Sequence, residues 1–143
     1  MYGNKPAELK GYNSMQLLPF MKELKNDKTK QEMFPGLLNN LSIKTVPSKE
    51  RNFQNIVFID TPGLADGNLK YKFDVEAVYK WFAKHCDIVF VFLDPIGQAL
   101  CAKTNALVNE LISQDCAEVR FIMTKGDMFR TDQDRAKCMC QIT

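Results

Sequence analysis

The feature that most constrains this fold is a run of consecutive apolar residues, Ile88-Val89-Phe90-Val91-Phe92-Leu93. A strand with one solvated face alternates apolar and polar residues, whereas a strand covered on both faces is apolar throughout. The run has the length of a β-strand and is far shorter than the ~20 residues that cross a bilayer. We therefore expect an interior strand of a sheet that is covered on both faces.

Two further apolar runs flank this strand, and helical patterns separate the three. Residues 56–59 and 119–123 predict strands, with Asp60 at the carboxyl end of the first. Residues 73–86 and 102–113 carry apolar side chains at three- and four-residue spacing, which predicts amphipathic helices. Strand, helix, strand, helix, strand predicts an α/β fold: a mostly parallel sheet with helices on both faces.

The chain is less regular before this core. Residues 1–52 hold a candidate helix that Ser14 would cap and Pro19 interrupts, running to Leu24. Residues 25–30 are polar and predict a solvated turn, and residues 41–45 predict a half-buried strand ended by Pro47. We therefore divide the chain into residues 1–52 and a core over residues 53–130.

Composition narrows the class of protein. The length of 143 residues suits one domain. The net charge of +2 is too small to create an electrostatic field that would favour binding of nucleic acid. The five cysteines are odd in number and scattered, which favours reduced thiols, and the single His85 leaves Cys138 and Cys140 without a second ligand pair for zinc. No signal peptide is expected after Met1. We expect a cytoplasmic protein.

Polar residues follow the first predicted strand, at the edge where parallel sheets bind ligands. In Asp60-Thr61-Pro62-Gly63, an acidic residue at a strand end suits Mg²⁺ held through water. Gly63 has no Cβ, so its backbone N–H can approach a phosphate closely. The same tetrapeptide is ordinary turn chemistry, with Pro at the second position and Gly at the fourth.

A second cluster, Thr124-Lys125-Gly126-Asp127, follows the last predicted strand. There the Asp127 carboxylate could accept two N–H groups from a guanine edge while the Lys125 stem packs on the base. One helix–strand–helix passage separates the two clusters. Together they favour a nucleotide site over two unrelated turns.

These clusters resemble the third (Asp-x-x-Gly) and fourth (Asn/Thr-Lys-x-Asp) GTPase motifs in their dynamin-superfamily forms. Residues 74–83 and Phe92-Leu93-Asp94-Pro95 resemble Eps15-homology-domain (EHD) ATPases of that group. The resemblance covers about residues 55–130. It implies that residues 1–143 are a partial dynamin-type GTPase domain with a three-layer, P-loop NTPase-like sheet.

The resemblance also implies roles and ligands. Asp60 would position Mg²⁺, Gly63 would sense the γ-phosphate, and residues 64–72 would be a switch segment. Lys125 and Asp127 would select the base with Thr124 bracing the loop, and Thr61 and Pro62 would complete the nucleotide-binding set. GTP is the expected nucleotide, with ATP as the alternative because EHD relatives bind ATP. Homo-oligomers, a full-length dynamin-like relative and peripheral attachment to membranes that the family remodels are the implied partners.

The P-loop that would hold the phosphates is missing from this sequence. It requires Gly-x-x-x-x-Gly-Lys-Ser/Thr, and none of the seven glycines is followed by Lys. In GTPases of this fold, the strand that carries the P-loop lies between those matching residues 56–60 and 88–93. The last strand and the fifth motif are also absent. We therefore expect a fragment that does not hydrolyse GTP alone.

Other interpretations stay open. The chain could be a non-catalytic interaction protein that keeps a dynamin-like oligomerisation surface. An unrelated Rossmann-like enzyme is disfavoured because no Gly-x-Gly-x-x-Gly follows a first strand. Finally, Cys140-Gln141-Ile142-Thr143 loosely matches a prenylation box, with unfavourable Gln and Thr.

Overall fold

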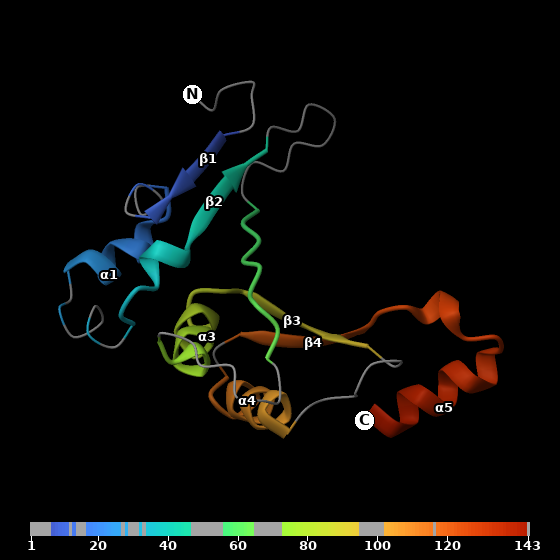
Figure 1. Cartoon of the computed structure of the whole chain (residues 1–143). Helices are drawn as coiled ribbons and strands as arrows, with labels where there is room; N and C mark the ends of the chain where they lie inside the picture. Colours follow the sequence, from blue (N-terminus) through green and yellow to red (C-terminus); the bar gives the residue numbers. More distant parts are fainter. Residues whose placement is uncertain are drawn as a thin grey trace. The chain divides into compact units, whose positions relative to one another are not determined.

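The structure is a computed structural model, and it describes residues 7–11, 13, 17–26, 28, 32, 34–46, 56–64, 73–94, 102–115 and 117–142. The chain divides into two compact units, Met1–Thr61 with Tyr71–Val75, and Pro62–Lys70 with Glu76–Thr143. The first contains an antiparallel strand pair and the second a parallel pair, with several helices around them (Figure 1). The expectation of an α/β chain is confirmed at this level.

The first unit contains a two-stranded antiparallel sheet and short helical turns. Strand β1 (Ala7–Lys10) pairs with β2 (Ser42–Thr45), which confirms the strand predicted over residues 41–45. The helical turns are the 3₁₀ helices η2 (Pro19–Met21) and η3 (Leu38–Asn40) and helix α1 (Lys22–Asn26). The buried side chains of this unit include Met21, Leu24, Phe34 and Leu37.

Two predictions for the first unit need correction. The helical segment begins at Pro19 instead of being interrupted there, because Pro has no N–H and fits the first position of a helical turn. Ser14, its predicted cap, lies outside the described residues. Lys25 and Asn26 end helix α1 and do not belong to a turn. Pro47, predicted to end the strand before it, also lies outside the described residues.

The prediction of a strand over residues 56–59 is wrong. Residues 56–64 carry no regular secondary structure, and they appear as a green trace in Figure 1. Ile56, Val57 and Phe58 are 52%, 59% and 83% exposed. A strand is held by backbone hydrogen bonds to a neighbour. Within the described part of the chain, no strand pairs with this segment, so its apolar pattern alone does not form a strand.

The second unit is built on two parallel strands. Strand β3 (Ile88–Leu93) pairs with β4 (Glu118–Met123) in a register that sets Ile88 beside Glu118 and Leu93 beside Met123. Helix α4 (Ala102–Ser113) lies between them in sequence, and α3 (Val75–Ala83) precedes β3. The predictions for β3, α4 and β4 are confirmed, and α3 is shorter than predicted. Lys84 and His85 form a hydrogen-bonded turn that ends α3 before residue 86.

The core of the second unit lies between the helices and one face of the strand pair. Ala83 of α3 packs with Leu107 and Leu111 of α4, and Val89 and Val119 of the strands lie against them. A second cluster of buried residues consists of Val91, Leu93 and Val108. Both helices therefore cover the same face of the sheet.

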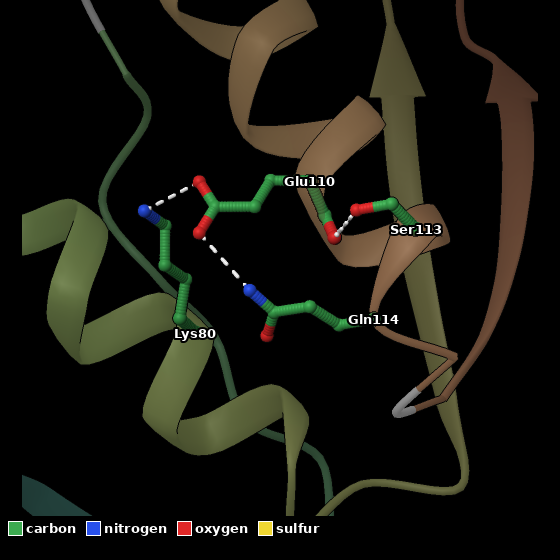
Figure 2. Close-up of polar contacts among 4 residues, drawn as sticks. All are labelled: Lys80, Glu110, Ser113 and Gln114. Atoms are coloured by element: carbon green, nitrogen blue, oxygen red, sulfur yellow. Dashed lines mark hydrogen bonds and ion pairs between the residues drawn. The ribbon is translucent and has the colours of Figure 1, made fainter.

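A polar contact at the edge of this core joins the two helices. Lys80 Nζ of α3 lies 2.6 Å from Glu110 Oε2 of α4, and Figure 2 marks this ion pair. Gln114 Nε2 donates to the other Glu110 oxygen at 3.0 Å, and Ser113 Oγ donates to the Glu110 backbone carbonyl at 2.8 Å. The Lys80 and Glu110 side chains are 29% and 41% exposed. Such a partly solvated pair adds at most about 1 kcal/mol to stability, so the apolar contacts carry the packing.

The opposite face of β3 is not covered by the described elements. Ile88, Phe90 and Phe92 are 45%, 46% and 64% exposed. The rings of Phe90 and Phe92 lie 6.3 Å apart, centroid to centroid. The prediction of helices on both faces is therefore wrong for the described part of the chain, because α3 and α4 pack on the same side.

The chain continues after β4 into a 3₁₀ helix and then helix α5 (Asp132–Ile142), which was not predicted. Thr131 caps α5, because its Oγ1 accepts the N–H of Asp134 at 3.2 Å. The pattern Thr131-x-x-Asp134 is a capping-box-like signal that would have indicated this helix. The described helices include none with the length and apolarity to span a membrane.

Candidate functional site

The candidate site lies at the carboxyl ends of β3 and β4. Because the strands are parallel and Leu93 is in register with Met123, the chain leaves both at the same edge. Thr124 ties the two ends together. Its backbone N–H donates to the Leu93 carbonyl at 2.8 Å, and its hydroxyl donates to the same oxygen at 3.0 Å. The first residue of the second polar cluster thus anchors the loop to β3.

Lys125 follows in a left-handed backbone conformation, with φ 54° and ψ 27°. A residue with a Cβ adopts this conformation at a cost of about 1 kcal/mol, so it needs support from its surroundings. Its Nζ lies 2.5 Å from Oδ2 of Asp94, the residue directly after β3. The lysine and aspartate side chains are 50% and 37% exposed.

Sequence reasoning missed this contact. Asp94 belongs to the residues that resemble the EHD group, and its sequence context predicts no role for it. The signal was present, because Asp94 and Lys125 each lie just beyond the ends of predicted strands. Parallel strands bring such residues to one edge. What the sequence lacked was the pairing of β3 with β4.

Asp127 lies in the 3₁₀ helix η4 (Gly126–Met128), which the Met128 N–H closes by donating to the Lys125 carbonyl at 3.0 Å. The Asp127 side chain is exposed. In the described part of the chain, no hydrogen bond or ion pair engages its carboxylate. Thr124, Lys125 and Asp127 therefore lie on one short loop, with an acidic group available to accept N–H donors.

The first polar cluster is divided between the two units. Asp60 and Thr61 belong to the first, and Pro62 and Gly63 to the second. All four are exposed. The Pro62 carbonyl accepts a hydrogen bond from the Tyr79 hydroxyl of α3. Within the described part of the chain, the position that a Cβ at Gly63 would occupy is open.

The predicted switch segment over residues 64–72 is described only at its first residue. Leu64 packs against the cluster of Ala83, Leu107 and Leu111. Residues 65–72 lie outside the described residues. The second unit thus anchors the start of this segment through an apolar contact and the Pro62 carbonyl.

The described cysteines are free thiols. Burial, and secondly the negative charge of Asp87, raise the pKa of Cys86 above its ordinary value. Cys140, the weak lipidation candidate, is exposed on α5, and Cys138 on the same helix is half-buried. Among the described residues, no group of three acidic, Cys or His side chains gathers around a point that could hold a metal ion.

The residues present suit a nucleotide base better than a triphosphate. Asp127 offers an exposed acceptor, and Lys125 beside it offers an aliphatic stem. A triphosphate would need the glycine-rich loop and its lysine, and the sequence contains no such pattern. The only acidic residue predicted for Mg²⁺, Asp60, is a single exposed carboxylate.

Comparison with known proteins gives a distant relationship. The chain resembles EH domain-containing protein 2. It is 25% identical to the rat, mouse and human proteins of that name over 99 residues, which are 67% of this chain and 18% of each relative. The chain thus spans about a fifth of the length of these curated relatives. No protein-family model matches the sequence, and no solved structure matches the chain.

Proposed function

We propose that this chain is part of an EHD/dynamin-like nucleotide-binding domain and that it binds the base of a guanine nucleotide through Thr124, Lys125 and Asp127. The complete domain would have a P-loop NTPase-like sheet, of which β3 and β4 are two adjacent strands. This chain alone would not hydrolyse the nucleotide. Its expected setting is the cytoplasm, with peripheral attachment to membranes.

The observation that carries the proposal is the position of the Thr124-Lys125-Gly126-Asp127 loop. The loop follows a parallel strand at its carboxyl end, where open α/β sheets bind ligands. Thr124 fixes the start of the loop to β3 through two hydrogen bonds, and the Asp127 carboxylate is exposed. A carboxylate in this position can accept the paired N–H groups of guanine. The distant similarity to EH domain-containing protein 2 supports the EHD/dynamin-like part of the proposal, and the choice of guanine rests on Asp127.

Magnesium and phosphate binding form the weaker half of the proposal. Mg²⁺ keeps most of its waters and takes few carboxylates, so Asp60 could hold it only together with nucleotide phosphates. Thr61, Pro62 and Gly63 would contribute backbone groups beside it. Without a P-loop, phosphate binding would be weak, and recognition of the base would dominate the affinity.

Titration of the purified chain with a fluorescent GTP analogue tests the proposal. We expect saturable binding that excess GTP reverses, and weaker competition by ATP. Asp127→Asn should weaken GTP binding at least ~10-fold, because an amide cannot accept both guanine N–H groups, and should shift preference toward xanthine nucleotide. Asp132→Asn, an exposed acidic residue on α5, is the matched control. Absence of saturable binding by the unaltered chain would refute the proposed function.

One observation favours a second candidate, a non-catalytic interaction protein. The face of β3 that no described element covers exposes Ile88, Phe90 and Phe92 side by side. Apolar residues grouped in this way commonly mark binding surfaces. Sedimentation of the unaltered chain and of Phe92→Asp distinguishes this candidate from nucleotide binding. If the chain self-associates through this face, the substitution should make it monomeric whether or not the chain binds nucleotide.

A further inference from the structure

We infer that Asp94 is a positioning residue for base recognition: it holds Lys125 in the conformation in which the lysine stem can lie along a bound base. The inference rests on the proposed function and adds a residue outside both polar clusters of the sequence. Asp94 follows β3, and Lys125 follows its parallel neighbour β4 by two residues.

Lys125 is held at both ends, at its backbone and at its ammonium. Lys125 Nζ lies 2.5 Å from Asp94 Oδ2, and the pair bridges the carboxyl ends of the two strands. Thr124 already fixes the backbone one residue earlier, with both its N–H and hydroxyl on the Leu93 carbonyl. The lysine is thus held at its backbone by β4 and the Thr124 anchor, and at its ammonium by Asp94.

The backbone of Lys125 adds a second observation. Its left-handed conformation is unfavourable for a residue with a Cβ, and such conformations persist where several contacts specify them. The Thr124 anchor, the η4 turn closed by the Met128 N–H and the Asp94 contact together supply that specification. Of these, only the contact with Asp94 restrains the side chain of Lys125.

The consequence for a ligand follows from the shape of lysine. When the ammonium is held at its tip, the methylene stem has few rotamers left and presents an apolar edge beside the Asp127 loop. A base that packs on the stem then orders fewer bonds on binding, and this reduces the entropic cost of association. Asp94 also neutralises the charge of the Lys125 ammonium. Selection between nucleotide bases then depends on the Asp127 carboxylate.

The test is a double-mutant cycle on the full chain, with the fluorescent GTP analogue as probe. Asp94→Asn should weaken binding about two- to fivefold, in keeping with a half-exposed ion pair. Lys125→Met keeps an unbranched stem but removes the ammonium. In that background Asp94→Asn should have no further effect, because Asp94 acts through Lys125. Asp94→Glu should retain most of the affinity, and Glu118→Gln, which removes an ion pair at the opposite end of β4, is the control.

A second readout separates this inference from the proposed function. The NMR signals of Lys125, both backbone amide and side-chain ammonium, should shift in Asp94→Asn and stay unchanged in Glu118→Gln without any nucleotide. Binding unaffected by Asp94→Asn, equal losses in both lysine backgrounds, or unshifted Lys125 signals would each overturn the inference. If the unaltered chain binds no nucleotide while the Lys125 signals shift, the proposed function fails, and with it the positioning role. The ion pair would then be purely structural.

Discussion

The packing of α4 against the strands predicts that substitution by Ala destabilises the chain much more at Leu111 than at the neighbouring Ile112. Leu111 is 5% exposed and belongs to the cluster with Ala83 and Leu107, whereas Ile112 is 51% exposed. Replacement by Ala removes the same three carbons in either case. The two substitutions therefore compare burial at almost constant chemistry.

The expected loss in the free energy of unfolding follows from the burial of each side chain. At ~0.8 kcal/mol for each buried methylene, Leu111→Ala loses about 2.4 kcal/mol of transfer free energy. The cavity left behind raises the expected loss to about 3 kcal/mol. Ile112→Ala loses about half as much transfer free energy and leaves no enclosed cavity. It also gains ~0.4 kcal/mol because Ala has the higher helix propensity, so we expect a loss below about 1 kcal/mol.

Urea unfolding followed by Trp81 fluorescence measures both free energies of unfolding. Trp81 is the single tryptophan, it is 8% exposed, and it lies in α3, which packs with α4. If Leu111→Ala fails to fold, the volume-conserving Leu111→Met, with an expected loss below about 1.5 kcal/mol, takes its place. Equal losses for Leu111 and Ile112 would refute the packing described here.

Three further outcomes are expected from other parts of the chain. Because the pKa of Cys86 is raised by burial and then by Asp87, iodoacetamide at about pH 8 should label Cys86 more slowly than exposed Cys140, as peptide mass spectrometry would show. The folded state holds the Cys86 proton more tightly than the unfolded state, so this group's contribution to stability is present below the ordinary thiol pKa and is lost as the pH rises through the raised one. Thr131→Ala should remove the α5 cap and destabilise that helix by ~1 kcal/mol, seen as faster amide exchange over residues 132–138, whereas Thr131→Ser should exchange like the unaltered chain.

Local patterns predicted the regular elements of the second unit. The apolar run at β3 and the helical spacing of α4 each specify an element, because side-chain periodicity depends only on the residues of that element. The Thr131 cap is an equally local signal, because it depends only on Thr131 and Asp134. Residues 56–59 show the limit of such patterns, since an apolar run becomes a strand only when a neighbour supplies its hydrogen bonds.

The candidate site was predictable in part. The loop with Thr124, Lys125 and Asp127 was located by its place after an apolar strand, and the structure puts it at the end of β4. The contact between Asp94 and Lys125 was not predicted, because it joins residues 31 positions apart. It depends on which strands pair and in which register.

By itself, the sequence determined an α/β chain with a strand at residues 88–93, a helix at 102–113 and two polar clusters that resemble GTPase motifs. It also determined that no P-loop is present. Only the tertiary structure decided that α3 and α4 share one face of the β3–β4 pair, that none of the described elements covers the other face of β3, and that Asp94 holds Lys125. The physical reason is that periodicity tells which side of an element avoids water, whereas the neighbour that covers that side is chosen by contacts between distant residues.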